Sequence, residues 1–516
     1  MAVQYVPDLD TFRKLAKEGN LVPVYRELSA DLDTPVSVFL KLKQEAPTFL
    51  LESVEGGEKL GRYSFIGVGH DLVLKSSRDR AIVYQNGDRR RVQLDGRDCL
   101  HLVEELLGQR QVVRIPGLPR FFGGAVGYVS YDMVRAFEKL PECASDELGL
   151  PECVFVFTET MIIFDHVQHK VKIVANTRVD GPAEYAYSTA LAKIDLIVAR
   201  ISRTLPPEQN GGGATKVPAG QDREAESNMT REEYEEGVRA CKKYIAAGDA
   251  FQIVLSQRLR RRTRAQPFAM YRALRMLNPS PYMFYLDLGD FQLVGASPEM
   301  LVKVEDGLAE TCPIAGTRPR GATEEEDEAL AAELLNDPKE KAEHAMLVDL
   351  SRNDLGRVCE YGTVRVPISM SVQKYSHVMH MVSTVEGRLR AGENAFSLLR
   401  AAFPAGTVSG APKIRAMEII TELENSKRGP YAGAVGYFSF TGNMDTCITI
   451  RTIVMVGSTV YLQAGAGIVY DSDPAREYQE SLNKLKALER AVELAEGEGR
   501  PSDLAVSAED RGRKPA

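Results

Sequence analysis

The alternation of apolar and polar residues predicts different secondary structure in the two halves of the chain. In the first 200 residues, short apolar runs such as 48–54 and 63–68 are separated by polar turns, as expected for strands. Asn86 and Gly87 form a dipeptide that is typical of a tight β-hairpin. This half is therefore predicted to be mostly antiparallel sheet.

Longer segments with helical spacing begin in the second half. Thr230 and Glu233 are spaced as a capping box, and Gly248 follows the apolar stripe as a helix stop signal. The next segment, 250–259, alternates between apolar and polar residues and is predicted to be a strand.

Composition divides the chain between these halves. Residues 205–228 are rich in Pro, Gly, Gln and charge, which is typical of a linker. We therefore expect an N-terminal domain at 10–204 and a second domain at 229–495. The polar segment 496–516 is predicted to be a disordered tail.

One short repeat crosses the two halves. The pentapeptide Gly-Ala-Val-Gly-Tyr occurs at 124–128 and again at 433–437. This repeat suggests equivalent central strands in two related sheets. Five residues are, by themselves, a weak basis for a duplication.

Two segments of the second half place acidic pairs at the start of a helix. Asp337 and Pro338 predict a capped helix that carries Glu340 and Glu343 on one face. The segment that begins at Asp473-Pro474 repeats the pattern, with its acidic pair again three residues apart, at Glu477 and Glu480. If the two helices lie side by side, four carboxylates converge and can hold Mg²⁺. By spacing alone, solvated helix surface is the commoner explanation.

The overall charge limits the classes of partner. The 516 residues carry a formal net charge of −8, which argues against a general nucleic-acid binder. The basic run at 258–264 is predicted to be a solvated strand end. Hydrophobic residues make up 44% and charged residues 26% of the chain, as in ordinary soluble proteins.

The cysteines and the apolar runs predict a cellular location. Seven cysteines are scattered without the spacing of a metal knuckle or a redox pair, which favours a reducing compartment. No leader is evident at residues 1–8, and no apolar run reaches membrane-spanning length. We expect a cytoplasmic protein that does not associate with membranes.

Long motifs of the chain resemble the chorismate-utilising enzymes. The resemblance extends over about residues 10–494, and its ordered matches are too many for chance. The motifs are, in chain order, 295–299, 313–321, the acidic helix from Asp337, 375–380, 403–413 and 465–469.

The resemblance implies both a fold and a reaction. The expected fold is α+β, with two antiparallel β-sheets packed against each other and helices on the outside. Among the family, the chain is most similar to members that convert chorismate and ammonia to anthranilate and pyruvate. The rivals are the aminodeoxychorismate synthases, which make the 4-amino product, and a non-catalytic tryptophan-sensing subunit. The complete set of acidic and His residues argues against a non-catalytic subunit.

The family's metal and substrate contacts can be assigned residue by residue. The resemblance implies that Mg²⁺ lies near Glu340, Glu343, Glu477 and Glu480 and binds the ring carboxylate of chorismate. Arg451 and Tyr431 would meet the second carboxylate, because Arg presents paired donors. Further contacts to the substrate are expected from Thr311, Ala315, Gly316, Thr317, Gly465, Ala466 and Gly467. Taken singly, Arg451 would more often be structural, and a Gly-x-Gly more often a bend.

The family's catalytic residues also map onto the chain. Glu299 matches the general acid that protonates the leaving C4 hydroxyl, provided that burial raises its pKa. His380 is the candidate that assists removal of the C2 proton, although a buried structural His is the alternative. Thr407 would be a polar contact of the reacting groups.

Two positions separate the subfamilies. Isochorismate and salicylate synthases carry a Lys that activates water where this chain has Gln252. Many aminodeoxychorismate synthases carry a Lys where this chain has Ala315. Since neither residue here can activate water or act as a nucleophile, direct attack by ammonia is expected.

Two further segments resemble the family's feedback site. Glu52 and Ser53 are expected to bind L-tryptophan, which would act as an inhibitor. The second segment comprises Asn278, Pro279, Ser280, Pro281, Tyr282 and Met283. Each segment alone would pass as a strand end or a turn, and only their joint occurrence supports the prediction.

None of the seven cysteines lies in the glycine-flanked setting of a glutaminase nucleophile. A separate glutamine amidotransferase subunit is therefore expected to supply ammonia, in a heterotetramer.

Overall fold

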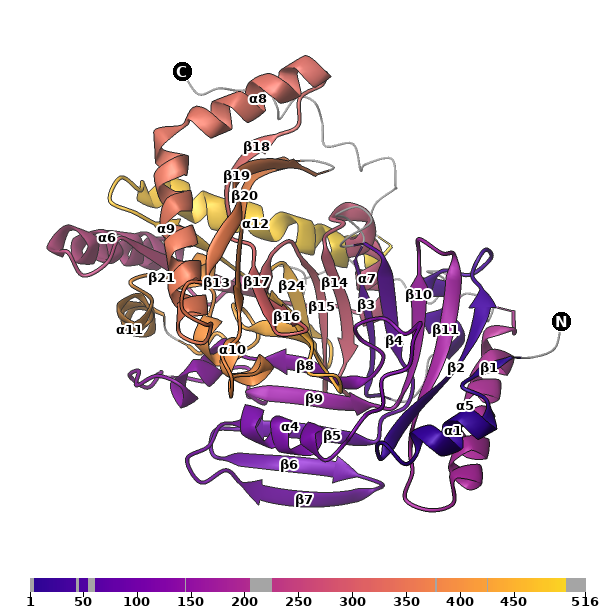
Figure 1. The fold of residues 1–516 in the computed structure, drawn as a ribbon. Coiled ribbons are helices and arrows are strands. Elements are labelled where there is room, and N and C mark those ends of the chain that lie inside the picture. Colours follow the sequence, from indigo (N-terminus) through magenta and orange to yellow (C-terminus); the bar gives the residue numbers. More distant parts are fainter. Residues whose placement is uncertain are drawn as a thin grey trace.

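The computed structural model describes residues 4–42, 46–53, 61–143, 145–204, 225–375, 378–424 and 426–497 (Figure 1). Most of the predicted linker and nearly all of the predicted tail lie outside these residues. Within them, no helix has both the length and the apolar character that crossing a membrane requires.

Sheet A comprises thirteen of the described strands, and its neighbouring strands are antiparallel. In order across the sheet they are β1 (Tyr5–Val6), β2 (Leu21–Ser29), β11 (Lys170–Arg178), β10 (Thr160–Asp165), β4 (Tyr63–Gly67), β3 (Thr48–Glu52), β14 (Tyr282–Asp287), β15 (Phe291–Ser297), β24 (Thr452–Val456), β25 (Thr459–Ile468), β13 (Gln252–Arg262) and β12 (Glu226–Ser227). The short strand β21 (Gly410–Ala411) also pairs with β13.

Sheet B comprises twelve of the described strands and is also antiparallel. In order they are β18 (Ile314–Pro319), β20 (Val378–Arg388), β17 (Leu308–Thr311), β16 (Met300–Glu305), β23 (Met444–Ile448), β22 (Ala434–Ser439), β8 (Gly124–Val129), β9 (Cys153–Thr158), β5 (Leu72–Ser77), β6 (Arg80–Gln85) and β7 (Asp88–Gln93). Strand β19 (Arg365–Lys374) also pairs with β20.

The two sheets pack against each other through a shared apolar core. The ring of Phe65 in β4 lies 6.2 Å from that of Tyr437 in β22, and Tyr128 of β8 lies 5.7 Å from Phe291 of β15. Each pair joins one sheet to the other. Burial of these large side chains supplies much of the force that holds the sheets together.

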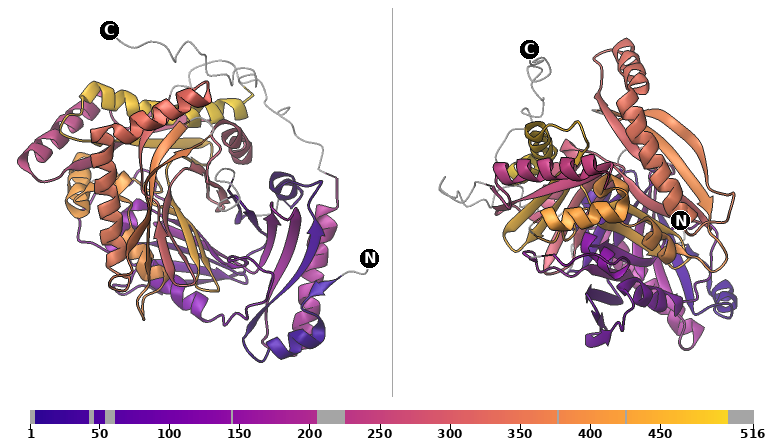
Figure 2. Two further views of the ribbon diagram at one scale, coloured as in Figure 1. Left: turned by 45° about the horizontal axis from the view of Figure 1, so that its top comes forward. Right: turned by 90° about the vertical axis from the view of Figure 1, so that its left-hand side faces the viewer.

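Helices cover the outer faces, as the predicted fold class requires (Figures 1 and 2). Sheet A is covered by α1 (Leu9–Leu15), α2 (Pro35–Leu42), α5 (Ala183–Ile201), α6 (Arg231–Ala247), α7 (Pro267–Leu277), α11 (Lys413–Leu423) and α12 (Pro474–Ala495). Sheet B contacts α4 (Cys99–Gly108), α8 (Glu324–Asn336), α9 (Pro338–Gly356) and α10 (Ala395–Ala402). Two short 3-10 helices are η1 (Tyr131–Ala136) and η2 (Gly406–Val408).

Both sheets contain strands from both halves of the chain. In sheet A, β3 pairs with β14, and in sheet B, β8 pairs with β22. The predicted linker therefore separates two parts of the sequence, but each sheet is built from strands of both parts.

The repeated pentapeptide occupies adjacent strands of one sheet. Gly127 of β8 is the register partner of Gly436 of β22. The prediction of equivalent strands in two sheets was therefore wrong. The glycines have a packing role, because a Cβ at Gly127 would lie 1.8 Å from the Val154 carbonyl oxygen.

The local signals in the sequence are confirmed. Asp337 and Asp473 cap α9 and α12, and Thr230 and Glu233 form the capping box of α6. Asn86 has the positive φ of +52° that a tight hairpin requires between β6 and β7.

Two features differ from expectation. Arg258, predicted at a solvated strand end, is only 3% exposed, because the loop after α11 covers this part of β13. The sulfur atoms of Cys99 in α4 and Cys153 in β9 are bonded to each other, a pairing that their spacing does not predict.

Candidate functional site

The predicted site residues lie on elements that meet where β13 begins and β25 ends. Ile253 is the register partner of Ile468, and Gln252 that of Ala411 in β21, which follows η2. Helix α9 contacts η2, β18 and β20. The fold thus brings most of the predicted catalytic, substrate and metal residues into one region.

Glu299 is a buried carboxyl group, 8% exposed, next to a threonine hydroxyl. Thr407 Oγ1 donates to Glu299 Oε1 at 2.9 Å. Burial raises the pKa of Glu299 to about 8, although the Thr407 bond acts in the opposite direction. Thr311 lines the same cavity of about 30 Å³ and donates to the Leu301 carbonyl oxygen. Near pH 7, Glu299 is a neutral acid that can donate a proton.

Gln252 connects the substrate region to the acidic helix α9. Its Nε2 donates to Glu343 Oε1 at 3.1 Å, while its buried Oε1 has no hydrogen-bond partner among the described residues. A Cβ at Gly467 would lie 2.4 Å from Gln252 Nε2. Gly467 therefore makes room for this amide.

Helices α9 and α12 bring the four predicted metal ligands within electrostatic reach. Burial raises the pKa of Glu343, and the carboxylates of Glu340 and Glu480 raise it further. Burial also raises the pKa of Glu477, with a further contribution from Glu480. Such crowding favours a cation between the carboxylates.

The chemistry of these donors fits Mg²⁺. All four are oxygen donors, and Mg²⁺ commonly binds one or two carboxylates while keeping several waters. In the part of the chain that the structure describes, no group of three acidic, His or Cys side chains is arranged to hold a metal ion. Any ion here would therefore draw on fewer protein ligands, as Mg²⁺ does.

Lys484 is a residue of this region that sequence reasoning missed. Its Nζ pairs with Glu480 Oε1 at 2.8 Å and donates to the Gly465 carbonyl oxygen at 2.9 Å. The spacing of four residues from Glu480 on one helix was the available signal. Lys484 thus ties an acidic residue to the glycine-rich end of β25.

His380 is held as a neutral base. Its Nδ1 lies 3.1 Å from the Gly316 carbonyl oxygen and 3.1 Å from Thr317 Oγ1. Burial lowers the pKa of His380 and nearby Arg451 adds to this effect, while the bond to Gly316 opposes it. Because the carbonyl oxygen can only accept, Nδ1 carries the proton and Nε2 is free to accept one.

Gly316 joins His380 to the acidic group. Its φ is +65°, and a Cβ there would lie 2.9 Å from Glu340 Oε2. Any larger residue would be strained and would press on this carboxylate. Its neighbour in the predicted contact set, Ala315, is buried in β18, and Ala466 is buried in β25.

Tyr431 and Arg451, the predicted carboxylate contacts, are both largely buried. Burial raises the pKa of Tyr431 to about 12, and its hydroxyl is hydrogen-bonded to the backbone of Gly465. Arg451 Nη1 donates to Asn278 Oδ1 at 3.1 Å. Burial lowers the pKa of Arg451, which forms no ion pair within the described residues. This guanidinium therefore retains donors for an anionic ligand.

A second cavity, of about 520 Å³, lies between the two sheets. It is lined by Glu52, Ser53, Pro281, Tyr282 and Met283, so five of the eight predicted feedback residues meet there. Asn278, Pro279 and Ser280 are not part of its lining. The Glu52 carboxylate accepts hydrogen bonds from Tyr271 and Arg275.

Sheet B supplies cavity residues that the sequence did not indicate. Arg120 bonds to Glu305 and Asp445, and the Tyr282 hydroxyl donates to Asp445 Oδ1 at 3.1 Å. Tyr437, from the second copy of the pentapeptide, also lines the cavity. Only the repeat marked this strand, and its position across the cavity depends on the packing of the sheets.

The sequence matches the family of chorismate binding enzymes over residues 47–490. Anthranilate synthase component 1 of Acetivibrio thermocellus is 49% identical over 492 residues, which cover 95% of this chain and 99% of that protein. The protein of the same name from Pseudomonas aeruginosa is 47% identical over 493 residues, with coverage of 94% and 99%.

Solved structures show the same fold. Anthranilate synthase component I from Streptococcus pneumoniae matches with a TM-score of 0.74 and 37% identity, covering 90% of this chain and 99% of that one. The menaquinone-specific isochorismate synthase from Escherichia coli matches with a TM-score of 0.67 and 20% identity, covering 94% and 98%. The second match, at this identity, concerns the fold alone.

The buried carboxyl of Glu299 predicts a pH-dependent stability difference. Its pKa rises from an ordinary 4.5 to about 8 on folding, so between these values the folded protein retains a proton that the unfolded chain has lost. Stability of the parent protein therefore falls as pH rises through this window, by up to about 1.4 kcal/mol per pH unit. Glu299→Gln lacks this effect.

Calorimetric unfolding from pH 4.5 to 9 checks this prediction. The unfolding temperature of Glu299→Gln minus that of the parent should increase as the pH rises to about 8. Above that pH the difference should stay constant. Glu328→Gln, at an exposed position of α8, serves as the control and should show a constant difference. A constant difference for Glu299→Gln would contradict the prediction.

Proposed function

The chain belongs to the family of chorismate binding enzymes, and from this premise we propose that it is an anthranilate synthase large subunit that uses ammonia and Mg²⁺ and responds to L-tryptophan. The observation that carries the proposal is the pairing of opposite charges in one site. Arg451 is a largely buried guanidinium that forms no ion pair with any of the described residues, and Glu343 lies in a group of crowded carboxylates. Chorismate has two carboxylates, one for a guanidinium and one for a metal ion.

The metal ion would lie near Glu340, Glu343, Glu477 and Glu480, with one or two of these carboxylates as its direct ligands. When bound, it supplies charge neutralisation and orientation for the ring carboxylate of the substrate. Without it, that carboxylate would face four acidic side chains, of which Glu480 is paired with Lys484 and Glu340 with Arg318.

The chain's own residues then move the protons. Glu299, neutral near pH 7, donates its proton to the C4 oxygen as that group leaves and ammonia adds at C2. His380 Nε2 accepts the C2 proton during elimination of pyruvate. Tyr431 and Arg451 hold the enolpyruvyl carboxylate in place throughout.

Gln252 supports ammonia as the nucleophile. Its amide cannot take a proton from water, but its Oε1, which has no partner among the described residues, can accept a hydrogen bond from an incoming N–H. Ala315 is equally unable to form a covalent intermediate. These residues favour anthranilate over the isochorismate or 4-amino product.

Ammonia would come from a separate glutamine amidotransferase subunit, with which the chain would form a heterotetramer in the cytoplasm. The relatives named component 1 support a multi-component enzyme. Among the described cysteines, the free and buried Cys241 and Cys447 have pKa values raised by burial, unlike those of nucleophiles.

The cavity between the sheets would bind L-tryptophan. Its volume of about 520 Å³ suits an amino acid with a large ring, and its lining combines Met283 and Phe65 with charged groups. Glu52 would meet the amino group. Because this cavity is lined by residues other than those of the substrate site, inhibition would be a population shift between two arrangements.

Product identification tests the proposed reaction. The purified chain, incubated with chorismate, Mg²⁺ and ammonium, should yield anthranilate on chromatography, whereas glutamine should not replace ammonium. A 4-amino product would assign the chain to the aminodeoxychorismate synthases instead. Absence of turnover would favour a non-catalytic subunit.

Glu343→Gln should weaken Mg²⁺ binding at least tenfold, because it removes one negative charge from the crowded group. Isothermal titration with MgCl₂ measures this directly and needs no turnover. Glu328→Gln, which alters an exposed glutamate, is the matched control. Unchanged Mg²⁺ affinity in Glu343→Gln would remove that residue from the metal site.

Ser53→Ala should raise the dissociation constant of L-tryptophan about tenfold, the size expected for a hydrogen bond to a charged group. Titration calorimetry gives the constant, and Ser188→Ala on the exposed face of α5 is the control. Equal affinity in the two variants would exclude Ser53 from the tryptophan site.

A further inference from the structure

A fully buried ion pair lies next to the proposed substrate site. Arg428 and Glu424 have side chains that are 1% and 5% exposed, and Arg428 Nη2 lies 2.6 Å from Glu424 Oε1. A second bond joins Arg428 Nε to Glu424 Oε2 at 2.8 Å. The pair is thus bidentate, the strongest geometry for these groups.

The remaining donors of Arg428 reach two elements of the substrate site. Nη1 donates to the Val408 carbonyl oxygen at 2.7 Å, and Nη2 donates to that of Val254, also at 2.7 Å. Val408 belongs to η2, which carries Thr407, and Val254 belongs to β13, two residues after Gln252. One guanidinium therefore links two catalytic segments.

The same guanidinium packs beside the aromatic ring of Tyr431. Its central carbon lies 5.7 Å from the centre of the Tyr431 ring and 4.6 Å from that of Tyr131. Cation–π contacts in a dry environment favour this arrangement. Tyr431 is in turn hydrogen-bonded to Gly465.

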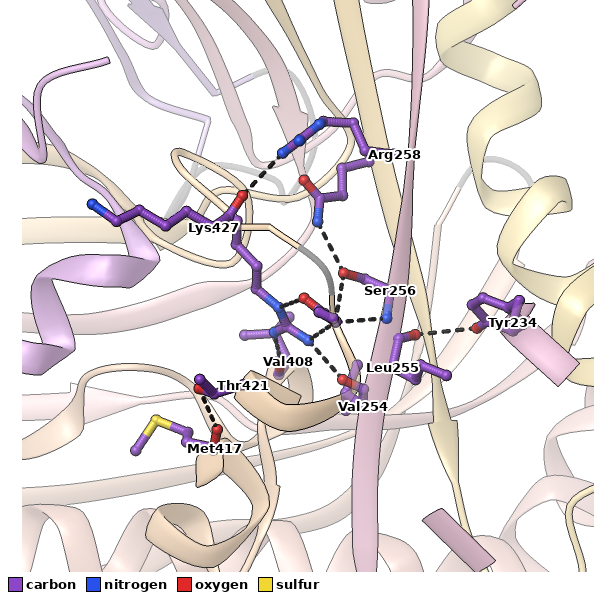
Figure 3. A network of polar contacts seen from close by, with 12 residues as sticks. Tyr234, Val254, Leu255, Ser256, Arg258, Val408, Met417, Thr421 and Lys427 are labelled. Atoms are coloured by element: carbon purple, nitrogen blue, oxygen red, sulfur yellow. Dashed lines mark hydrogen bonds and ion pairs between the residues drawn. The ribbon is translucent and has the colours of Figure 1, made fainter. Parts of the chain in front are cut away.

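Glu424 extends the network to β25 through Ser256, which Figure 3 labels together with Val254 and Val408. Its Oε1 accepts the backbone N–H and the hydroxyl of Ser256, both at 2.9 Å. Gln463 of β25, two residues before Gly465, donates to the same Ser256 hydroxyl oxygen at 2.9 Å. The network thus spans β13, β25, η2 and the loop after α11.

We propose that Arg428, oriented by Glu424, is a positioning residue that fixes the distances between Tyr431, the Thr407 segment and β13. The inference rests on the proposed function, because it takes Tyr431 and Gly465 as contacts of the chorismate enolpyruvyl carboxylate. Arg428 acts through Tyr431 and the two carbonyl groups, and it does not touch the substrate.

Lysine cannot replace this arginine. Its ammonium group is a single point charge, whereas the planar fork of Arg428 directs five N–H donors along fixed directions. In Arg428→Lys, the three donors of the ammonium group cannot make all four bonds that Arg428 forms with Glu424, Val254 and Val408, and the Tyr431 ring loses its planar partner.

Steady-state kinetics distinguish positioning from stability. Arg428→Lys should raise KM for chorismate about tenfold or more, because the carboxylate contacts no longer hold their geometry. A purely structural role would lower the folded fraction, and hence the apparent kcat, while KM stayed constant. Glu424→Gln keeps the arginine but removes its charged partner, and it should also raise KM for chorismate. This variant replaces Arg428→Lys in the test if Arg428→Lys does not fold.

Arg110→Lys is the matched control. Arg110 is also buried, pairs with Asp71, donates to a backbone carbonyl oxygen and packs over the rings of Phe157 and Phe440, but it contacts none of the site residues. Its substitution should leave KM for chorismate unchanged. Equal KM values in Arg428→Lys and Arg110→Lys would overturn the inference.

A double-mutant cycle tests the route through Tyr431. In a Tyr431→Phe background, Arg428→Lys should raise KM by much less than in the parent. Both changes disturb the same contact, that between the Tyr431 hydroxyl and the substrate carboxylate. Full additivity of the two effects would overturn this route.

Titration of chorismate by calorimetry separates this inference from the proposed function. If the parent protein binds chorismate but forms a product other than anthranilate, the proposed function fails, and a tenfold loss of affinity in Arg428→Lys still supports positioning. If the parent does not bind chorismate, both fail. If the parent and Arg428→Lys bind chorismate with equal affinity, only the positioning inference is wrong.

Discussion

The antiparallel pairing of β3 with β14 is the constraint that links the cavity between the sheets to the proposed substrate site. Its register places Glu52 opposite Met283. The first half of the chain is thus joined directly to the segment 278–283, which leads toward the proposed substrate site. One end of that segment lines the cavity between the sheets, and Asn278 at its start bonds to Arg451. A ligand that moves β14 would therefore also move an arginine of the proposed substrate site. The proposed feedback would therefore have a direct physical route from one site to the other.

Local signals carried much of the prediction, since they depend on neighbours in sequence. The caps at Asp337 and Asp473 and the capping box at Thr230 are set by residues within one turn. They fixed where the helices with the acidic pairs begin, although spacing alone left open whether those pairs would meet. The electrostatic interaction between Glu343 and Glu480 depends on two helices more than 100 residues apart in the chain, and only the resemblance to known motifs suggested that the pairs would meet.

Long-range packing accounts for what the sequence did not reveal. Arg258 was interpreted as solvated because it begins a basic run, but a loop from beyond residue 420 covers it. Arg428 carries no local sign of importance, since its partners Val254 and Val408 lie in distant segments. Asn278 was predicted as part of the feedback segment, but its contact with Arg451, 173 residues away, had no signal in the sequence.

Arg428, which is buried, and Arg451, which is largely buried, have different hydrogen-bond partners. Arg428 donates from all three of its nitrogen atoms, so its charge is neutralised and its position is fixed. Arg451 has Asn278 as its hydrogen-bond partner and lacks a carboxylate among the described residues. A buried charge without a counterion is costly, and an incoming anion relieves that cost. Arg428 thus fixes the geometry of the proposed site, whereas Arg451 is the arginine proposed to bind the anionic substrate.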